Sequence, residues 1–596
     1  MSSERPLAGG YARKLYRLME PLHRRRAGFL VVLLAIAMLL EVLGIGFVIP
    51  ALVVITTPDI GAKYPAIAPL LAALGHPTQA ELVVMGMGSL VIIYAVKSGF
   101  LVYVSWFQSR FVFGLFSNLA QRLFANYLRM PYEFFLVRNS APLMRNLTTE
   151  LNYFSSAAQS TMMFFTECVI MSGIIVLLVV IEPIGTAVVC LFVGSAAWIF
   201  QRAIRTRLMR WGTLRQHHDG LRIQHIQQGI GSVKDIKVLG REEDFLQKFR
   251  THNYGFTGVL QRQYFTQQLP RLWLELLAVM GLAAVVFLMI ARGTPLSSVL
   301  PTIGLFGAAA FRLIPSVNRA MVALQGTRFG RPGIELLYQE LIENAAPPAV
   351  PSGIPMPFRQ SVEFENLSFS YTGADRLALD GVSLSIPHGA CVGFIGGSGA
   401  GKSSLIDLLM GVLTPSSGRI AVDGVDIQSN LRGWQGHIGY VPQSIFLTDD
   451  TLKRNVAFGL SDAQLDEVAV WRALRYAQLD QFIRDLPDGL ETMVGERGVR
   501  LSGGQRQRIA IARALYHDPD VLVLDEATSA LDNATESGVM EAVRAMQGTK
   551  TILIVAHRLT TVANCDILVL LEKGRIKQVA RSLAEIKQAG MTEPVP

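Results

Sequence analysis

The chain has 596 residues, too many for one compact domain and a suitable length for two or three. Hydrophobic residues make up 51% and charged residues 17%, too apolar for a soluble enzyme and too polar for a protein of membrane helices alone. The net charge is +9, but basic residues cluster beside apolar segments, as at 24–26, so we attribute the charge to membrane topology and expect no nucleic-acid partner. The four cysteines form no CxxC pair, which argues against a disulfide framework or a zinc site.

Apolar segments dominate the first half of the chain. A membrane-spanning helix needs roughly 20 mostly apolar residues, and we predict six such helices. They lie near residues 28–56, 80–107, 157–181, 183–203, 268–291 and 296–316. The first segment is longer than the apolar part of a signal peptide, so we expect it to be retained as a membrane helix.

The connections between these segments predict the topology. The stretches after the second and fourth segments are long, charged and compatible with helices, and they begin with basic residues such as Arg110 and Arg202. Basic residues favour the cytoplasmic side, whereas the loop at 57–79 contains one Lys and no Arg and is expected outside. We therefore predict two long cytoplasmic helical extensions.

A change in composition marks the end of the membrane half. Residues 344–358 contain five prolines and are interpreted as a linker. Beyond them, short apolar strands alternate with helices, the pattern of an α/β nucleotide-binding domain. The predicted organisation is a helical transmembrane domain over 1–343, a linker over 344–358 and an α/β domain over 359–596.

The sharpest local motif is a phosphate-binding loop. It follows the apolar strand 391–395, precedes a helix, and matches G-x-x-x-x-G-K-[ST]. Its glycines let backbone N–H groups surround a phosphate, Lys402 is expected to reach the β- and γ-phosphates, and Ser403 to bind Mg²⁺. The predicted nucleotide contacts of this loop are Gly396, Gly397, Ser398, Gly399, Ala400, Gly401, Lys402, Ser403 and Ser404.

A second acidic motif supports the first. Four apolar residues, 521–524, predict a buried strand that ends at Asp525 and Glu526. Asp525 suits the shell of a Mg²⁺ ion, and Glu526 suits a general base that activates the attacking water. An apolar run followed by two acidic residues is common and usually structural, but beside a phosphate loop it indicates ATP hydrolysis.

The sequence Leu501-Ser-Gly-Gly-Gln505 resembles the signature of ATP-binding-cassette (ABC) proteins, and further motifs follow in the order of that family. The resemblance implies an adenine-stacking role for Tyr371, a γ-phosphate and Mg²⁺ contact for Gln443, and a switch role in catalysis for His557. It also implies that nucleotide is contacted by Ser502, Gly503, Gly504, Gln505 and Asp532. The implied fold is the exporter fold with long cytoplasmic helices, whose coupling tips are expected near 130–136 and 230–240.

The number of motifs bears on assembly. The chain has one phosphate loop and one signature, and in the family the signature contacts nucleotide bound to the opposite cassette. We therefore expect a homodimer, the commonest symmetric assembly, with ATP and Mg²⁺ as cofactors. A cassette protein that regulates without pumping is the less favoured alternative, because Glu526 is intact.

Ionisable residues inside the apolar segments bear on the cargo. Each charge costs roughly 2.5–3.5 kcal/mol at the bilayer centre, so such residues are expected to face a cavity or each other. Lys97, Arg271 and Arg312 suit an anionic head group, whereas pairing with Glu41 and Glu275 or snorkelling to the interface remains open.

The segments around Arg271 and Arg312 resemble bacterial flippases for lipid-linked oligosaccharides, of the PglK type. That resemblance implies ATP-driven flipping of a polyprenyl-pyrophosphate-linked oligosaccharide to the outer leaflet of the bacterial inner membrane, with the ATPase domain in the cytoplasm. The alternative is export of another amphiphile, such as a lipid A-like glycolipid, a drug or a peptide.

Overall fold

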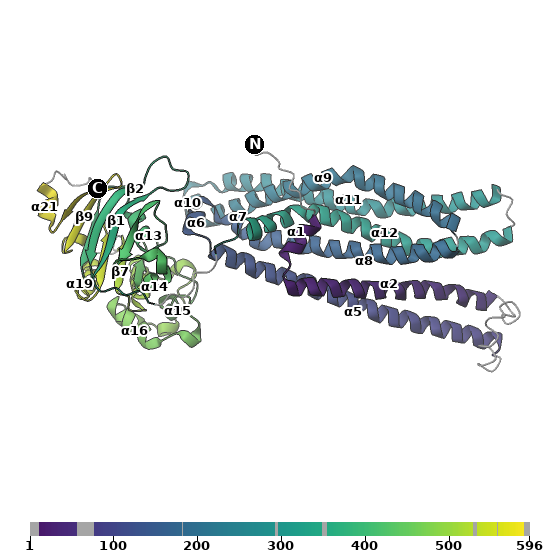
Figure 1. Ribbon diagram of the computed structural model, residues 1–596, viewed down its shortest axis with the longest axis horizontal. Coiled ribbons are helices and arrows are strands. Elements are labelled where there is room, and N and C mark those ends of the chain that lie inside the picture. The colour runs from purple at the N-terminus through teal and green to yellow at the C-terminus, as the bar shows by residue number, and fades with distance from the viewer. Residues whose placement is uncertain are drawn as a thin grey trace. The chain divides into compact units, whose positions relative to one another are not determined.

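The computed structural model describes residues 11–56, 77–181, 183–291, 296–347, 355–527, 533–556 and 558–588 (Figure 1). The chain divides into two compact units. The first comprises residues 1–130 and 139–347, and the second comprises residues 131–138 and 348–596. A short helical segment that lies inside the membrane half of the sequence thus belongs to the second unit.

The first unit is helical. Its long helices are α2 (Pro21–Thr56), α5 (Gln79–Leu128), α8 (Leu151–Ile181), α9 (Pro183–Gly231), α11 (Glu242–Ala291) and α12 (Leu296–Tyr338). Its shorter elements are α1 (Tyr11–Leu18), α7 (Ser140–Arg145), α10 (Val233–Leu239) and two π-helical turns, η2 (Asn146–Glu150) and η3 (Gln339–Glu343). The long helices pack as neighbours, α2 on α5, α8 on α12 and α9 on α11 (Figure 1).

Local sequence explains where some of these helices begin and end. Thr78 caps α5, because its hydroxyl accepts from the Glu81 amide and the Glu81 carboxylate accepts from the Thr78 amide. Gly240 ends α10 in the left-handed conformation, with φ of 62°.

Length and hydropathy identify membrane spans among the described residues. Three ranges qualify: Pro21–Gly44, Gln79–Leu128 and Ser140–Val180. They overlap the first three predicted segments, which the structure therefore supports. The other predicted segments lie within α9, α11 and α12, and their crossing of the membrane, with the total of six spans, stays a prediction. The predicted outer loop and the turns at 182 and 292–295 lie largely or wholly outside the described residues.

A fully buried ion pair joins η2 to α9 in the first unit. The Arg215 guanidinium donates from Nη1 and Nη2 to Glu150 Oε1 and Oε2, at 3.2 and 2.9 Å, and both side chains are wholly buried. The same guanidinium lies 3.6 Å from the centre of the Tyr153 ring. Two parallel hydrogen bonds and an aromatic face together satisfy a charge that burial alone would make costly.

The second unit is an α/β domain with two sheets. Its strands are β1 (Ser361–Phe369), β2 (Leu379–Pro387), β3 (Cys391–Ile395), β4 (Ser417–Val422), β5 (Val425–Asp426), β6 (Ile438–Val441), β7 (Val521–Asp525), β8 (Thr551–Val555), β9 (Ile567–Glu572) and β10 (Arg575–Ala580). An antiparallel sheet has the order β2-β1-β4-β5, and a six-stranded sheet has the order β10-β9-β3-β8-β7-β6. In the larger sheet β9, β3, β8, β7 and β6 are parallel and β10 is antiparallel.

Helices connect and cover these strands. They are α6 (Tyr132–Val137), α13 (Lys402–Leu409), α14 (Leu431–Gln435), α15 (Leu452–Val456), α16 (Glu467–Tyr476), α17 (Asp480–Arg484), α18 (Gly503–Leu515), α19 (Asn533–Arg544), α20 (Leu559–Val562) and α21 (Leu583–Gln588). Short 3₁₀ turns lie at 427–430, 462–464, 489–491 and 496–498.

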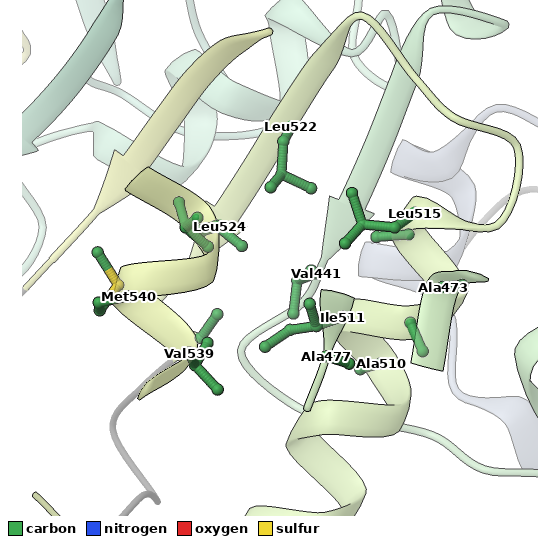
Figure 2. Packing of buried hydrophobic residues seen from close by; sticks show 14 of the residues in the cluster. Val441, Ala473, Ala477, Ala510, Ile511, Leu515, Leu522, Leu524, Val539 and Met540 are labelled. Atoms are coloured by element: carbon green, nitrogen blue, oxygen red, sulfur yellow. The ribbon is translucent and has the colours of Figure 1, made fainter. Parts of the chain in front are cut away.

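The core of the second unit lies against the larger sheet. Every residue of β3, β7 and β8 is buried, which explains why these strands are continuous apolar runs rather than alternating ones. Figure 2 shows Leu522 of β7 and Val441 of β6 on the side of the cluster that holds Ile511 and Leu515 of α18, and Leu524 of β7 near Met540 of α19. This packing fixes the strand ends from which the candidate site is built.

The helix α6 packs within the second unit. Glu133 accepts a hydrogen bond from the Thr372 hydroxyl at 3.3 Å. The first coupling tip predicted near 130–136 coincides with this helix, and the second, near 230–240, coincides with α10 of the first unit.

The buried ion pair yields a stability prediction. Arg215→Met removes both hydrogen bonds to the buried Glu150 carboxylate and leaves it only the longer 3.8 Å contact with Arg145; breaking a buried pair costs about 3–5 kcal/mol. We expect a clear fall in the thermal unfolding temperature of the detergent-solubilised protein. Arg241→Ala removes an exposed pair with Asp244 and should cost about 0–1 kcal/mol. Equal unfolding temperatures for the two variants would contradict the importance of the buried pair.

Candidate functional site: a nucleotide site at the sheet edge

The order of the parallel strands brings the predicted motifs to one edge. β3 leads into the phosphate loop, β7 ends at Asp525, and β6 ends two residues before Gln443. β8 lies between β3 and β7, and β6 is the neighbour of β7. The carboxyl ends of parallel strands meet at the same edge of a sheet, so segments more than 100 residues apart in the sequence converge there.

The phosphate loop has the conformation that its glycines permit. Gly399 and Gly401 have φ of 76° and 102°, values that disfavour a side chain. A Cβ on Gly401 would lie 2.7 Å from the Ala378 carbonyl oxygen, so the position has no room for a larger residue. The strand and helix predicted on either side of the loop are confirmed as β3 and α13.

Lys402 points its ammonium group back into this loop. Its Nζ donates to the carbonyl oxygens of Gly396 and Gly397, at 2.8 and 3.1 Å. Only 5% of the residue is exposed, and burial lowers the pKa of the ammonium group despite the opposing charges of Glu526 and Asp525. A cation held inside a ring of backbone amides suits a polyphosphate.

Asp525 and Glu526 occupy the end of β7. Asp525 is 7% exposed, and Glu526 adopts a left-handed backbone with φ of 52°, uncommon for a residue other than glycine. Its amide donates to the Val555 carbonyl at 3.0 Å, and its Oε2 accepts from Gln443 Nε2 at 2.7 Å. The strained turn and the Gln443 contact together fix the direction of the carboxylate.

Tyr371 lies beside the first turn of α13. Its hydroxyl is 2.8 Å from Ser404 Oγ, and its ring meets Phe369 edge to face with centroids 4.9 Å apart. The aromatic ring predicted to stack on adenine is therefore fixed next to the phosphate loop. Ser404, included in the predicted contact set, is buried and bonded to that tyrosine.

The signature residues form the start of α18. Ser502 is its N-cap: its hydroxyl accepts from the Gln505 amide at 3.2 Å, and its own amide donates to Gln505 Oε1 at 2.8 Å. Gly503 and Gly504 form the first turn, where free N–H groups and the helix dipole favour an anion. The motif is thus a capping box as well as a phosphate-binding element.

Two residues that the sequence analysis did not select lie beside Asp525. Burial, followed by the charge of Asp525, raises the pKa of Asp407 on α13 to about 6. Burial and a hydrogen bond with Asp525 raise the pKa of Tyr440 on β6. Neither Asp407 nor Tyr440 belongs to a recognisable sequence motif. Only the fold places these two side chains at the site.

Arg513 is a third residue outside the predicted set. From α18 it donates to the Asn455 and Phe446 carbonyl oxygens, at 2.8 and 2.9 Å, and so braces the segment that follows Gln443. Burial lowers its pKa to about 10. A lone charge in the apolar run 509–515 was the sequence signal that could have identified it.

Some predicted residues cannot be placed. Asp532 and His557 lie outside the described residues, as does the side chain of Arg312. The other two predicted cavity residues are paired. Lys97 Nζ lies 3.1 Å from Glu41 Oε2 with both side chains largely buried, and Arg271 Nε lies 3.1 Å from Glu275 Oε1 with both side chains exposed.

The donor atoms at the sheet edge fit a small divalent cation. Ser403 offers a hydroxyl, Gln443 an amide oxygen and Asp525 a carboxylate, all hard oxygen ligands of the kind that Mg²⁺ prefers. Among the described residues no three His, Cys, Asp or Glu side chains are grouped to hold a metal ion. A site with one carboxylate instead fits an ion that takes its remaining ligands from water and phosphate.

Comparison with known proteins defines the class. The ABC transporter family matches residues 379–529, and the ABC transporter transmembrane region matches residues 27–306. The ATP-dependent lipid A-core flippase of Chromobacterium violaceum is 31% identical over 540 residues, covering 88% of this chain and 91% of that protein. The protein of the same name from Burkholderia pseudomallei is 33% identical over 415 residues, 68% of each chain.

A solved structure shows the same fold. A bacterial Atm1-family ABC exporter with ATP bound superposes with a TM-score of 0.77, at 24% identity, over 95% of this chain and 97% of that one. The exporter fold with a transmembrane and a nucleotide-binding domain is thus confirmed. The chain belongs to the ABC transporter family, and more specifically it is an ATP-hydrolysing transporter in which both domains are fused.

The position of Glu526 predicts the effect of one substitution. Glu526→Gln keeps the shape of the side chain and removes its ability to accept a proton. General-base catalysis typically contributes about 10²–10⁴-fold to the rate. We expect ATP turnover to fall by that factor while ATP binding persists. Glu541→Gln on α19 changes an exposed carboxylate in the same unit and is the control. Near-normal turnover in Glu526→Gln would exclude the general-base role.

The pKa of Asp407 predicts a pH-dependent stability. Its folded-state pKa, about 6, exceeds the unfolded value of about 4, so the cost of the buried charge appears as pH rises through this window and is complete above it. Asp407→Asn should therefore raise the thermal unfolding temperature most at pH 8 and about half as much at pH 5, the middle of this window. Asp485→Asn, at an exposed position, is the control. An equal effect of Asp407→Asn at both pH values would contradict the prediction.

Proposed function

We propose that two copies of this chain hydrolyse ATP to flip an anionic lipid-linked glycan from the cytoplasmic to the outer leaflet of the bacterial inner membrane. The observation that carries the proposal is the Lys402, Asp525, Glu526 and Gln443 cluster, on a chain that also contains apolar helices long enough to span a membrane. The favoured cargo is a polyprenyl-pyrophosphate-linked oligosaccharide.

The ATPase step follows from the geometry of the sheet edge. Lys402 and the backbone amides of residues 396–404 bind the phosphates, and Tyr371 stacks on the adenine. Ser403, Gln443 and Asp525 are the proposed Mg²⁺ ligands, and the ion supplies charge neutralisation at the γ-phosphate. Glu526, held by Gln443 at 2.7 Å, accepts the proton of the attacking water. His557 is proposed as the switch residue that senses the γ-phosphate.

A second chain completes each site in this proposal. One signature and one phosphate loop per chain suit two composite sites, in which Ser502–Gln505 and Asp532 of one chain face ATP on the other. The helix α10 supports this assembly, because Val238 and Leu239 are 77% and 68% exposed at its tip. Apolar side chains exposed in this way suit docking on a partner cassette, whereas α6 packs on its own.

Three basic residues of the membrane unit are the proposed contacts of an anionic cargo, and Lys97 and Arg271 are paired with carboxylates in the structure. Lys97 lies between Glu41 at 3.1 Å and the Tyr94 ring at 4.4 Å, an arrangement that keeps an ammonium group in an apolar helix pair. Arg319 pairs with Glu167 in the same unit. An ionisable side chain within a membrane domain costs free energy even when it is paired. Its presence therefore marks a candidate functional position. Lys97, Arg271 and Arg312 are the proposed contacts of a pyrophosphate group.

The names of the relatives favour a second cargo. Proteins named lipid A-core flippases are 31% and 30% identical to this chain over 540 and 524 residues. A lipid A-like glycolipid is therefore the second candidate. Both candidates are sugar-bearing lipids, and both require the same ATP-driven transfer between leaflets.

Reconstitution separates the two cargoes. Liposomes that contain the protein receive a labelled polyprenyl-pyrophosphate oligosaccharide or a labelled lipid A-type glycolipid, and leaflet transfer is measured with ATP. We expect ATP-dependent transfer of the first lipid, and no transfer by Glu526→Gln. Transfer of the lipid A-type glycolipid alone would identify it, rather than the pyrophosphate lipid, as the cargo. Transfer of only a neutral amphiphile would refute the glycolipid proposal.

Lys97 provides the local test. Lys97→Met alone removes the ion pair and leaves the Glu41 charge buried, so the informative variant is Lys97→Met with Glu41→Leu, which removes both charges. Loss of a charge-assisted contact should slow transfer of the pyrophosphate lipid about tenfold or more. Lys577→Met, on β10 of the other unit, is the control. Unchanged transfer in the double variant would make the pair structural.

A further inference from the structure

Four histidines lie together on the neighbouring helices α9 and α11, away from the nucleotide site. They are His217, His218 and His225 on α9 and His252 on α11. The His218 and His252 rings have centroids 5.5 Å apart, His225 stacks on His252 at 5.3 Å, and His217 lies 5.4 Å from His218. Neither the ATPase nor the proposed cargo uses this cluster.

The spacing of two of these nitrogens matches a pair of metal ligands. His218 Nδ1 and His252 Nδ1 are 3.2 Å apart. Zn²⁺ binds imidazole nitrogen at about 2.0–2.1 Å with tetrahedral geometry, which places two ligand nitrogens about 3.3–3.4 Å apart. The same separation also allows an N–H···N hydrogen bond, so the two nitrogens already lie at about the distance that a shared ion requires.

Packing holds the two rings at the junction of the helices. His218 lies against Gly255 of α11, where a Cβ would come within 2.6 Å of the imidazole ring. A glycine at this position therefore admits the ring to the helix surface. His218 and His225 are seven residues apart and share one face of α9, which directs both toward α11.

Imidazole nitrogens are common ligands of Zn²⁺ and Cu²⁺, so the four rings are the candidate ligands of this cluster. The nearby Asp219 carboxylate pairs with Arg222 at 2.7 Å and leaves the imidazoles as the ligands.

We propose that His218 and His252 bind one divalent transition-metal ion of the Zn²⁺ or Cu²⁺ class between α9 and α11. No third His, Cys, Asp or Glu among the described residues is grouped with them to complete a metal site. The site is therefore open, with water in the remaining positions, and rotation of His225 or His217 can add a third nitrogen. Imidazole suits these ions, and an open site binds them reversibly.

Occupation of this site connects two arms of one helical hairpin. α9 and α11 lead to and from α10, so an ion held by His218 and His252 restrains the movement of one helix against the other. A ligand that binds one arrangement of two helices better than another shifts the equilibrium toward that arrangement.

Zinc binding to the full-length protein tests the proposal. The protein is purified with a tag that contains no histidine, and Zn²⁺ affinity is measured by competition with a chromophoric chelator. We expect one reversibly bound ion per chain. Loss of an outer-shell partner alone typically weakens metal binding 10–100-fold, so His218→Ala and His252→Ala should each weaken it at least about tenfold. His517→Ala, at an exposed position in the other unit, is the matched control and should bind like the parent.

A spectroscopic measurement needs no variant and covers the case in which a substitution disturbs folding. Cu²⁺ added to the unmodified protein should give an electron paramagnetic resonance spectrum with coupling to at least two imidazole nitrogens. Failure of the parent to compete for Zn²⁺ would overturn the proposal. Equal affinity in His252→Ala and the parent, or a copper spectrum with oxygen ligands only, would also overturn it.

Discussion

The nucleotide site depends on the parallel pairing of β3, β8, β7 and β6. Each of these strands is short and mostly apolar. The larger sheet is buried by helices on one face and by α13 and the antiparallel sheet on the other. Because the four strands run in the same direction, the loops that follow them open at one edge. Lys402, Asp525 and Gln443 can act on one nucleotide only because this pairing brings their loops together.

Backbone strain at that edge of the sheet orients the Glu526 carboxylate. Glu526 has a left-handed backbone, a conformation that costs free energy for a residue with a side chain. The buried strand before it and the hydrogen bond from its amide to Val555 hold this turn in place. The strain is offset by packing energy elsewhere in the sheet, and the result is a carboxylate that faces Gln443 before any ligand binds.

Burial of charge shapes the first unit in more than one place. Glu150 with Arg215 and Glu41 with Lys97 are both pairs in which burial forces a partner. The first pair joins segments 65 residues apart and stabilises a helical extension. The second pair lies between the apolar helices α2 and α5. A charge costs more free energy there, so this pair is a candidate for a functional role.

Local patterns in the sequence are sufficient to define the class of this protein. The phosphate loop, the acidic strand end and the signature are local patterns whose chemistry requires those residues at that spacing, so the ATPase could be predicted without coordinates. Apolar length likewise predicted the membrane half. The tertiary structure alone decided the pairings: Lys97 with Glu41, Tyr440 with Asp525, and His218 with His252. It also decided that α6 packs with the cassette unit. These contacts join residues far apart in the chain, and no local pattern encodes them, because they arise only when strand order and helix packing bring the segments together.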